Sequence, residues 1–174
     1  ILKELCESFS ADYHSIDYSK EKNFGSRKAP TSNVIQNTFA TLKSRIISQR
    51  EGDWIAIFNH YNIWMWHFLL LFTAARPVAE FPGFLKSFNL KRKICMVSDK
   101  EVGGRQGYGR LIPLGHFVVQ ELQKFIDFLD YFKTHIAPSQ PEIPQHIQQI
   151  LESKLPLLNI FQNGQWHTLR PSII

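Results

Sequence analysis

The fold is decided between Lys93 and Ile136, where the chain reads KICMVSDKEVGGRQGYGRLIPLGHFVVQELQKFIDFLDYFKTHI. Residues 93–98 and 108–113 favour strands, and the glycine-containing segment between them lets the chain turn back, so this part predicts an antiparallel hairpin. After Gly115 the apolar residues recur at alternating steps of four and three, which predicts one long helix with a single buried face. The residues of that face are Val118, Leu122, Phe125, Leu129, Phe132 and Ile136.

Two more helices are predicted before this segment. The first runs from 33 to 49, is capped by Ser32 or Asn33, and repeats its apolar residues at helical spacing. The second runs from about Asn59 to Ala75 and is apolar on nearly every side, so we expect it to be central. A short helix is also expected at about 79–84.

The region after the long helix predicts smaller elements. A helix is expected at 145–154, an extended segment at 157–161 and a turn at Asn163-Gly164. Together these features predict an α+β, mainly α fold, a helical domain with a small antiparallel β-sheet. We place this domain at residues 33–174, after a linker or partly ordered extension at residues 1–32.

Composition narrows the class of protein. The chain has 174 residues, 44% of them apolar, enough for one domain with a real core. Cys6 and Cys95 are too few for a disulfide framework and favour a reducing, intracellular setting. The histidines are scattered, so no metal site and no cofactor are expected. The most apolar segment, 63–75, is too short to cross a bilayer, so we expect a cytoplasmic location and no membrane partner.

The positive charge is concentrated in one part of the chain. Between Lys86 and Arg110 there are seven basic residues, opposed only by Asp99 and Glu101. The remaining 13 basic and 13 acidic residues cancel, so this window carries the whole formal charge of +5. A concentrated basic patch favours a polyanionic partner, with nucleic acid first.

Two motifs contain residues that are candidates for catalysis. One is Leu70-Leu-Phe-Thr-Ala-Ala-Arg-Pro-Val-Ala-Glu80, and the other joins Lys100, at the predicted hairpin, to Arg110-Leu-Ile-Pro-Leu114. They resemble the tyrosine recombinase (phage integrase) family, in which an apolar helix runs into a Thr-Gly-x-Arg turn with a glutamate four residues later. In that family a hairpin lysine and a return strand ending in Arg-x-x-Pro-Leu follow. The resemblance covers roughly residues 54 to 136, with Ala74 in place of the usual glycine.

The resemblance implies a catalytic domain that breaks and rejoins double-stranded DNA through a phosphotyrosyl intermediate. Arg76 would be the guanidinium that grips two non-bridging oxygens of the attacked phosphate. Lys100 would be the general acid that protonates the leaving deoxyribose oxygen. The DNA-binding residues expected from the basic window are Lys91, Arg92, Lys93, Arg105 and Arg110.

The rest of such a catalytic domain is less evident. His167-Thr-Leu-Arg170 has the letters of the family's His-x-x-Arg box, which makes His167 and Arg170 weaker catalytic candidates, because Pro171 disfavours the helix that the box opens. The chain's tyrosines all lie upstream of where the nucleophile should be. We therefore expect a truncated catalytic domain that is inactive alone, with a nucleoid-associated parent that pairs with other recombinase protomers.

Simpler interpretations stay open for each residue. Arg76 can act only as a cation at a helix C-terminus, and Lys100 can be an ordinary surface lysine. At the level of the protein, the alternatives are a non-catalytic DNA-binding module of the same fold and a helical protein-interaction domain.

Overall fold

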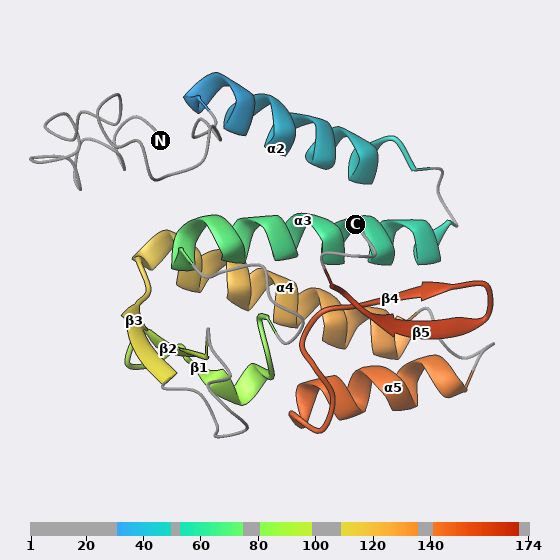
Figure 1. Cartoon of the computed structure of the whole chain (residues 1–174). Helices are drawn as coiled ribbons and strands as arrows, with labels where there is room; N and C mark the ends of the chain where they lie inside the picture. Colours follow the sequence, from blue (N-terminus) through green and yellow to red (C-terminus); the bar gives the residue numbers. More distant parts are fainter. Residues whose placement is uncertain (1–30, 50–52, 75–80, 99–108, 136–140, 171–174) are drawn as a thin grey trace, which may run out of the picture. The chain divides into compact units, whose positions relative to one another are not determined.

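The computed structural model describes residues 31–49, 53–74, 81–98, 109–135 and 141–170. They form mainly helices with small antiparallel sheets, which confirms the predicted mainly α, α+β class (Figure 1). From residue 36 onward the described residues belong to one compact unit. The helices are α2 (Ser32–Ile47), α3 (Trp54–Thr73), the 3-10 helix η1 (Leu85–Ser87), α4 (His116–His135) and α5 (Glu142–Leu151). The strands are β1 (Phe88–Asn89), β2 (Ile94–Ser98), β3 (Gly109–Pro113), β4 (Asn159–Gln162) and β5 (Gln165–Thr168).

The predicted hairpin is present as β2 and β3, which pair antiparallel from Ile94↔Pro113 to Ser98↔Gly109. A third strand, β1, pairs with the other side of β2 and gives the order β1-β2-β3. Strand β1 has only two residues, too few to produce an alternating pattern in the sequence.

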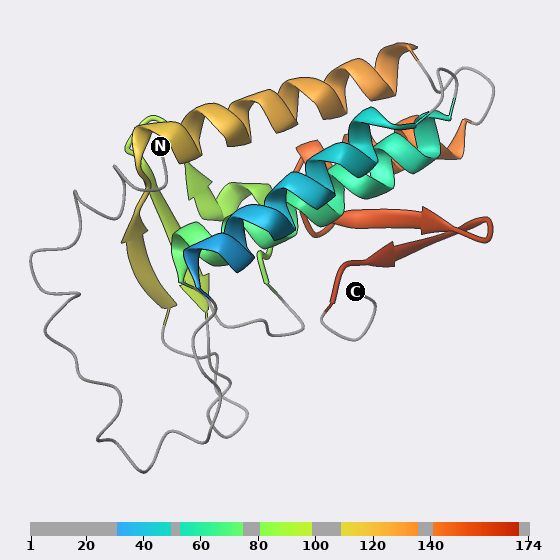
Figure 2. The same cartoon turned by 90° about the horizontal axis from the view of Figure 1, so that it is seen from above.

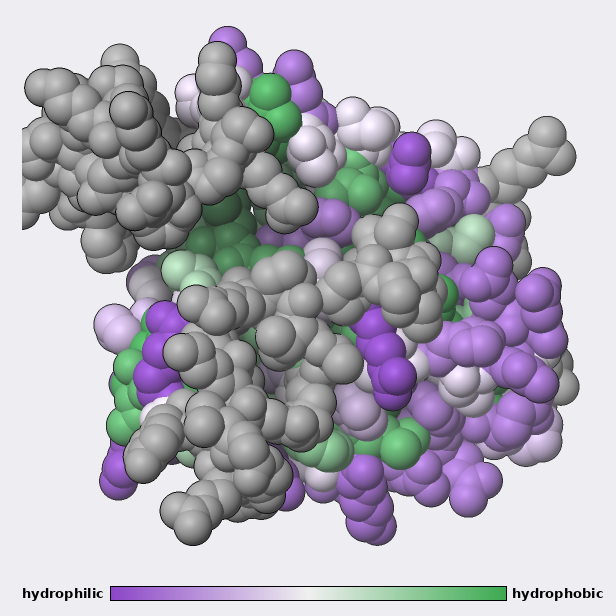
Figure 3. Space-filling view, in the orientation of Figure 1, coloured by the Kyte–Doolittle hydropathy of each residue, from purple (hydrophilic) through white to green (hydrophobic). Residues whose placement is uncertain are grey.

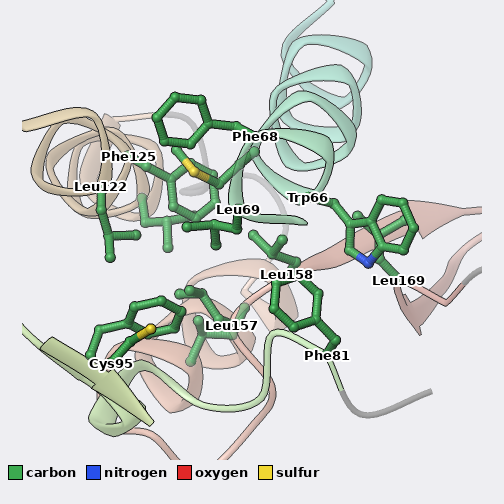
Figure 4. Close-up of a cluster of buried hydrophobic side chains, with 14 of the residues drawn as sticks. Trp66, Phe68, Leu69, Phe81, Cys95, Leu122, Phe125, Leu157, Leu158 and Leu169 are labelled. Atoms are coloured by element: carbon green, nitrogen blue, oxygen red, sulfur yellow. The ribbon is translucent and has the colours of Figure 1, made fainter. Parts of the chain in front are cut away.

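Helix α3 is the central element. It begins at Trp54, five residues earlier than predicted, because the carboxylate of Asp53 accepts a hydrogen bond from the backbone N–H of Ala56 at 3.3 Å. Because α3 is apolar on most sides, the spacing of its apolar residues does not show where the helix begins. Side chains from α3 point into the same cluster as side chains from α4, β2 and the segment before β4 (Figure 4). The α3 residues labelled in that close-up are Trp66, Phe68 and Leu69.

Helix α4 confirms its predicted buried face. Val118, Leu122, Phe125, Leu129 and Phe132 are all buried, and Ile136 lies outside the described residues. Helix α5 packs on α4 but begins at Glu142, three residues before the predicted start. The prediction was wrong because it kept Pro144 out of the helix. Pro144 lies in the first helical turn, where a missing N–H has no partner to lose.

Two other predicted boundaries were wrong. The cap of α2 is Thr31, whose hydroxyl accepts from the N–H of Val34 at 3.4 Å, instead of Ser32 or Asn33. The expected short helix at 79–84 is not found at 81–84, and residues 79 and 80 lie outside the described part. Pro82 and Gly83, with φ of 78° at the glycine, interrupt helical backbone there, and η1 forms just after them.

The end of the described chain is a β-hairpin. Strands β4 and β5 join through the predicted turn, where Asn163 and Gly164 both have positive φ. The sequence did not predict β5. The hairpin is fixed to α3 by side-chain amides: Asn59 exchanges two hydrogen bonds with the backbone of Phe161, at 2.7 and 2.8 Å. The fully buried Asn62 accepts from the N–H of Asn159 at 3.2 Å and donates to Phe58 at 2.9 Å.

None of the described helices combines the length and the apolar character needed to span a bilayer.

We predict that Asn62→Ala lowers the free energy of unfolding by about 2–3 kcal/mol, because the N–H of Asn159 is left buried without an acceptor. Urea unfolding followed by circular dichroism measures the loss. The matched control is Gln123→Ala, which removes an exposed side-chain bond to Asp127 and should cost no more than about 0.5 kcal/mol. Equal losses for the two variants would show that Asn62 does not hold the hairpin.

Candidate nucleic-acid interface

The C-terminal end of α3 is held by an arginine from the sheet. Thr73 closes the last turn by donating its hydroxyl to the carbonyl of Leu69 at 2.6 Å. Ala74 then adopts the left-handed conformation (φ 46°, ψ 32°), and its carbonyl accepts a hydrogen bond from Arg110 Nη2 at 2.9 Å. Carbonyls at a helix C-terminus lack partners within the helix and carry partial negative charge, so a guanidinium is favoured there.

Arg110 reaches this position from β3. It pairs with Val97 of β2, and Val97 and Cys95 are the buried residues of that strand. Burial raises the pKa of the Cys95 thiol to about 11, and the nearby guanidinium of Arg110 lowers it in part. Arg110 therefore lies at the rim of the core, between the sheet and the end of α3.

The two predicted catalytic residues, Arg76 and Lys100, lie outside the described residues, as do Glu80 and Arg105. The described residues nearest to them in the sequence belong to the place where Arg110 of β3 binds the end of α3, which we call the Arg110 corner. Ala74 is bound to Arg110, and Gly109, the neighbour of Arg110, pairs with Ser98. In the sequence, Arg76 follows Ala74 by two residues and Lys100 follows Ser98 by two residues. Both views place the end of α3 over the sheet (Figures 1 and 2).

The other predicted DNA-binding residues do not join Arg110. Lys91, Arg92 and Lys93 form the turn between β1 and β2, at the opposite end of β2. Lys93 pairs with Leu114 and Val97 pairs with Arg110, so four residues of strand separate the two sites. At about 3.4 Å per residue this separation is about 14 Å. The basic window is therefore split into two groups.

The outer face of the sheet between these groups is apolar. Met96 and Leu111 are cross-strand partners with 56% and 68% of their surface exposed. Figure 3 shows hydrophobic atoms at the end of the molecule where β3 lies, whereas hydrophilic side chains cover α5 and the β4–β5 hairpin. Basic groups therefore lie at the ends of the strands and not across this face.

The structure places His167 and Arg170 elsewhere. His167 is in β5 opposite Ile160, next to the point where Asn62 binds Asn159. Asn62 precedes Ala74 by twelve residues, which is about 18 Å along the helix axis. Arg170 is exposed and follows the buried Leu169. The structure thus gives His167 a strand position rather than one at the start of a helix, and does not bring it to the Arg110 corner.

Among the described residues, no three His, Cys, Asp or Glu side chains come together in a way that could hold a metal ion. The hydrogen bond between Arg110 and Ala74 could not be predicted from the sequence, because its acceptor is a backbone carbonyl 36 residues away, and any residue type carries such a carbonyl.

Comparisons with protein-family models, curated proteins and solved structures found no match. The functional assignment therefore depends on the residues themselves.

The left-handed backbone at Ala74 yields a stability prediction. Ala74→Gly should raise the free energy of unfolding by about 0.5–1 kcal/mol, because glycine adopts this conformation without a Cβ clash. The same substitution inside α3, Ala56→Gly, should instead lower it by about 1 kcal/mol. Thermal unfolding of the two variants and the parent measures both signs. A loss of stability from Ala74→Gly would contradict the left-handed end of α3.

Proposed function

We propose that this chain is part of the catalytic domain of a tyrosine-type DNA recombinase, and that the complete protein breaks and rejoins DNA through a phosphotyrosyl intermediate. One observation supports the proposal most: the Arg110–Ala74 hydrogen bond joins the end of α3 to the β2–β3 hairpin. The segments that carry Arg76 and Lys100 begin at these two elements. A guanidinium and an ammonium that start from one corner are able to act on one phosphate.

The chemistry assigns each group a task. A tyrosine hydroxyl attacks the phosphorus and releases its proton to solvent water, a Tyr–O–P bond forms and the bond to the leaving deoxyribose oxygen breaks. Arg76 binds two non-bridging oxygens and stabilises the added charge of the crowded transition state. Lys100 donates a proton to the leaving oxygen, which then departs as a hydroxyl. When that hydroxyl attacks the phosphotyrosine, the same steps run in reverse and Lys100 recovers its proton.

A second candidate function is a DNA-binding module that keeps this fold and does no chemistry. The basic turn 91–93 is compatible with it, because duplex binding does not require Arg76 or Lys100. Cleavage, and not affinity, therefore separates the two functions.

The decisive experiment uses the protein produced from the complete gene, with nicked duplexes tiled across the DNA that flanks the gene. A covalent protein–DNA adduct on a denaturing gel is the expected product. Arg76→Ala should lower the rate of adduct formation by about 100-fold or more, because it removes a donor to the transition state, and should change duplex affinity by less than about threefold.

The control is Arg45→Ala on the exposed surface of α2, which should leave the rate unchanged. Adduct formation at the parental rate without the Arg76 guanidinium would rule out the proposed role. Duplex binding with no adduct from the complete protein would favour the non-catalytic module.

The 174-residue chain by itself should form no adduct with the same nicked duplexes, because the proposed nucleophile is not among its tyrosines. Detection of a protein–DNA adduct from this chain alone, by denaturing gel and mass spectrometry, would show that one of those tyrosines attacks DNA.

A further inference from the structure

The turn between β1 and β2 presents three consecutive cations. Lys91, Arg92 and Lys93 are all exposed. In the described part of the chain, the ion pairs join lysines of α4 and of the segment after α5 to nearby acids, and none involves this turn. Three neighbouring cations that form no ion pair with the carboxylates of the described residues are a favourable place for an anion.

The backbone of this turn is fixed without the use of the charged groups. The N–H of Arg92 donates to Asn89 Oδ1 at 2.9 Å, and the N–H of Lys93 donates to the carbonyl of Leu90 at 3.3 Å. The carbonyl of Lys93 accepts from the N–H of Leu114 at 2.7 Å. The backbone of the turn is therefore already in place before a ligand binds, and the charged side chains remain available to that ligand.

Lys93 occupies a position that does not suit a lysine conformationally. Its φ is 54°, in the left-handed region that glycine and asparagine adopt at lower cost. A residue with a long charged side chain at such a position is unfavourable for stability, which is consistent with a role for its ammonium group.

The distance between the turn and the Arg110 corner indicates which kind of ligand can contact both sites. About 14 Å of strand is too far for both ends to contact one phosphate. The backbone phosphates of a DNA duplex form a regular row of negative charges, so a second contact at this distance falls on a different phosphate of the same duplex. The apolar Met96–Leu111 pair lies between the two basic ends. Two separated cationic ends match a linear array of phosphates better than one compact anion.

We propose that the Lys91–Lys93 turn binds the backbone of a DNA duplex at a second phosphate, about 14 Å from the phosphate held at the Arg110 corner. This inference builds on the proposed recombinase function and adds to it a second contact on the same duplex. The contact sets the register of the DNA on the sheet and reads no base.

The test uses three single variants of the complete protein, Lys91→Gln, Arg92→Gln and Lys93→Gly, and the matched controls Lys43→Gln and Lys124→Gln, which change exposed lysines on α2 and α4. Fluorescence anisotropy of a labelled duplex from 50 to 200 mM KCl gives the affinity and its salt dependence. Each turn variant should reduce the slope of log K against log [KCl] by about 0.9, and weaken binding roughly eightfold at 100 mM salt. The controls should change affinity less than about twofold.

Lys93→Gly separates a charge effect from a structural one. Because glycine relieves the positive φ, this variant should unfold at the same temperature as the parent or a higher one, while its DNA affinity falls. A fall in affinity that appears only with a fall in thermal stability would overturn the proposal.

The outcomes distinguish this inference from the proposed function. Salt-dependent duplex binding that all three substitutions leave unchanged overturns the inference and leaves the recombinase proposal standing. Weakened binding by the turn variants, together with normal cleavage by Arg76→Ala, supports the contact and rejects the catalytic assignment. Binding to vesicles that contain anionic lipid but not to duplex, with the same sensitivity to the turn variants, assigns the turn to a membrane surface and overturns both.

Discussion

The apolar character of α3 around most of its circumference is the constraint on which the rest of the unit depends. A helix with apolar residues around its whole circumference has to be covered by several elements at once. Helix α4, the β4–β5 hairpin and the sheet region contribute to one continuous core with it. Where the hairpin backbone approaches the helix, Asn59 and Asn62 supply the polar partners that an apolar surface lacks.

Much of the fold was predictable because its signals are local. The buried face of α4 follows from steps of three and four, and the β2–β3 hairpin from two β-favourable runs around a glycine-containing segment. What the sequence did not predict depends on distant contacts. Strand β5 pairs with β4, which Asn62 binds from 97 residues away in the sequence, and β1 is only two residues long. Neither feature leaves a periodic pattern.

The candidate site was predictable only in part. Residue types and spacing selected Arg110 and the turn lysines, but they did not separate them into two groups. That separation follows from the register of β2 and β3, which fixes Lys93 and Arg110 at opposite ends of an extended strand. A cluster of cations that is compact in sequence thus becomes elongated in space. Arg110 also stabilises a helix terminus, so its charge has a structural partner within the chain.

The turn of the β4–β5 hairpin is a position at which the chain can accept added sequence. Its tip, Asn163-Gly164, is exposed, and apart from the two chain neighbours no atom of the described residues lies within 4 Å of the position where a Cβ on Gly164 would stand. Strand β4 is tied to α3 through Asn59 and Asn62, so its position on α3 does not depend on the length of the tip. Exposed loop tips accept inserted sequence well. The tip is therefore a suitable position for an affinity epitope or a donor–acceptor dye.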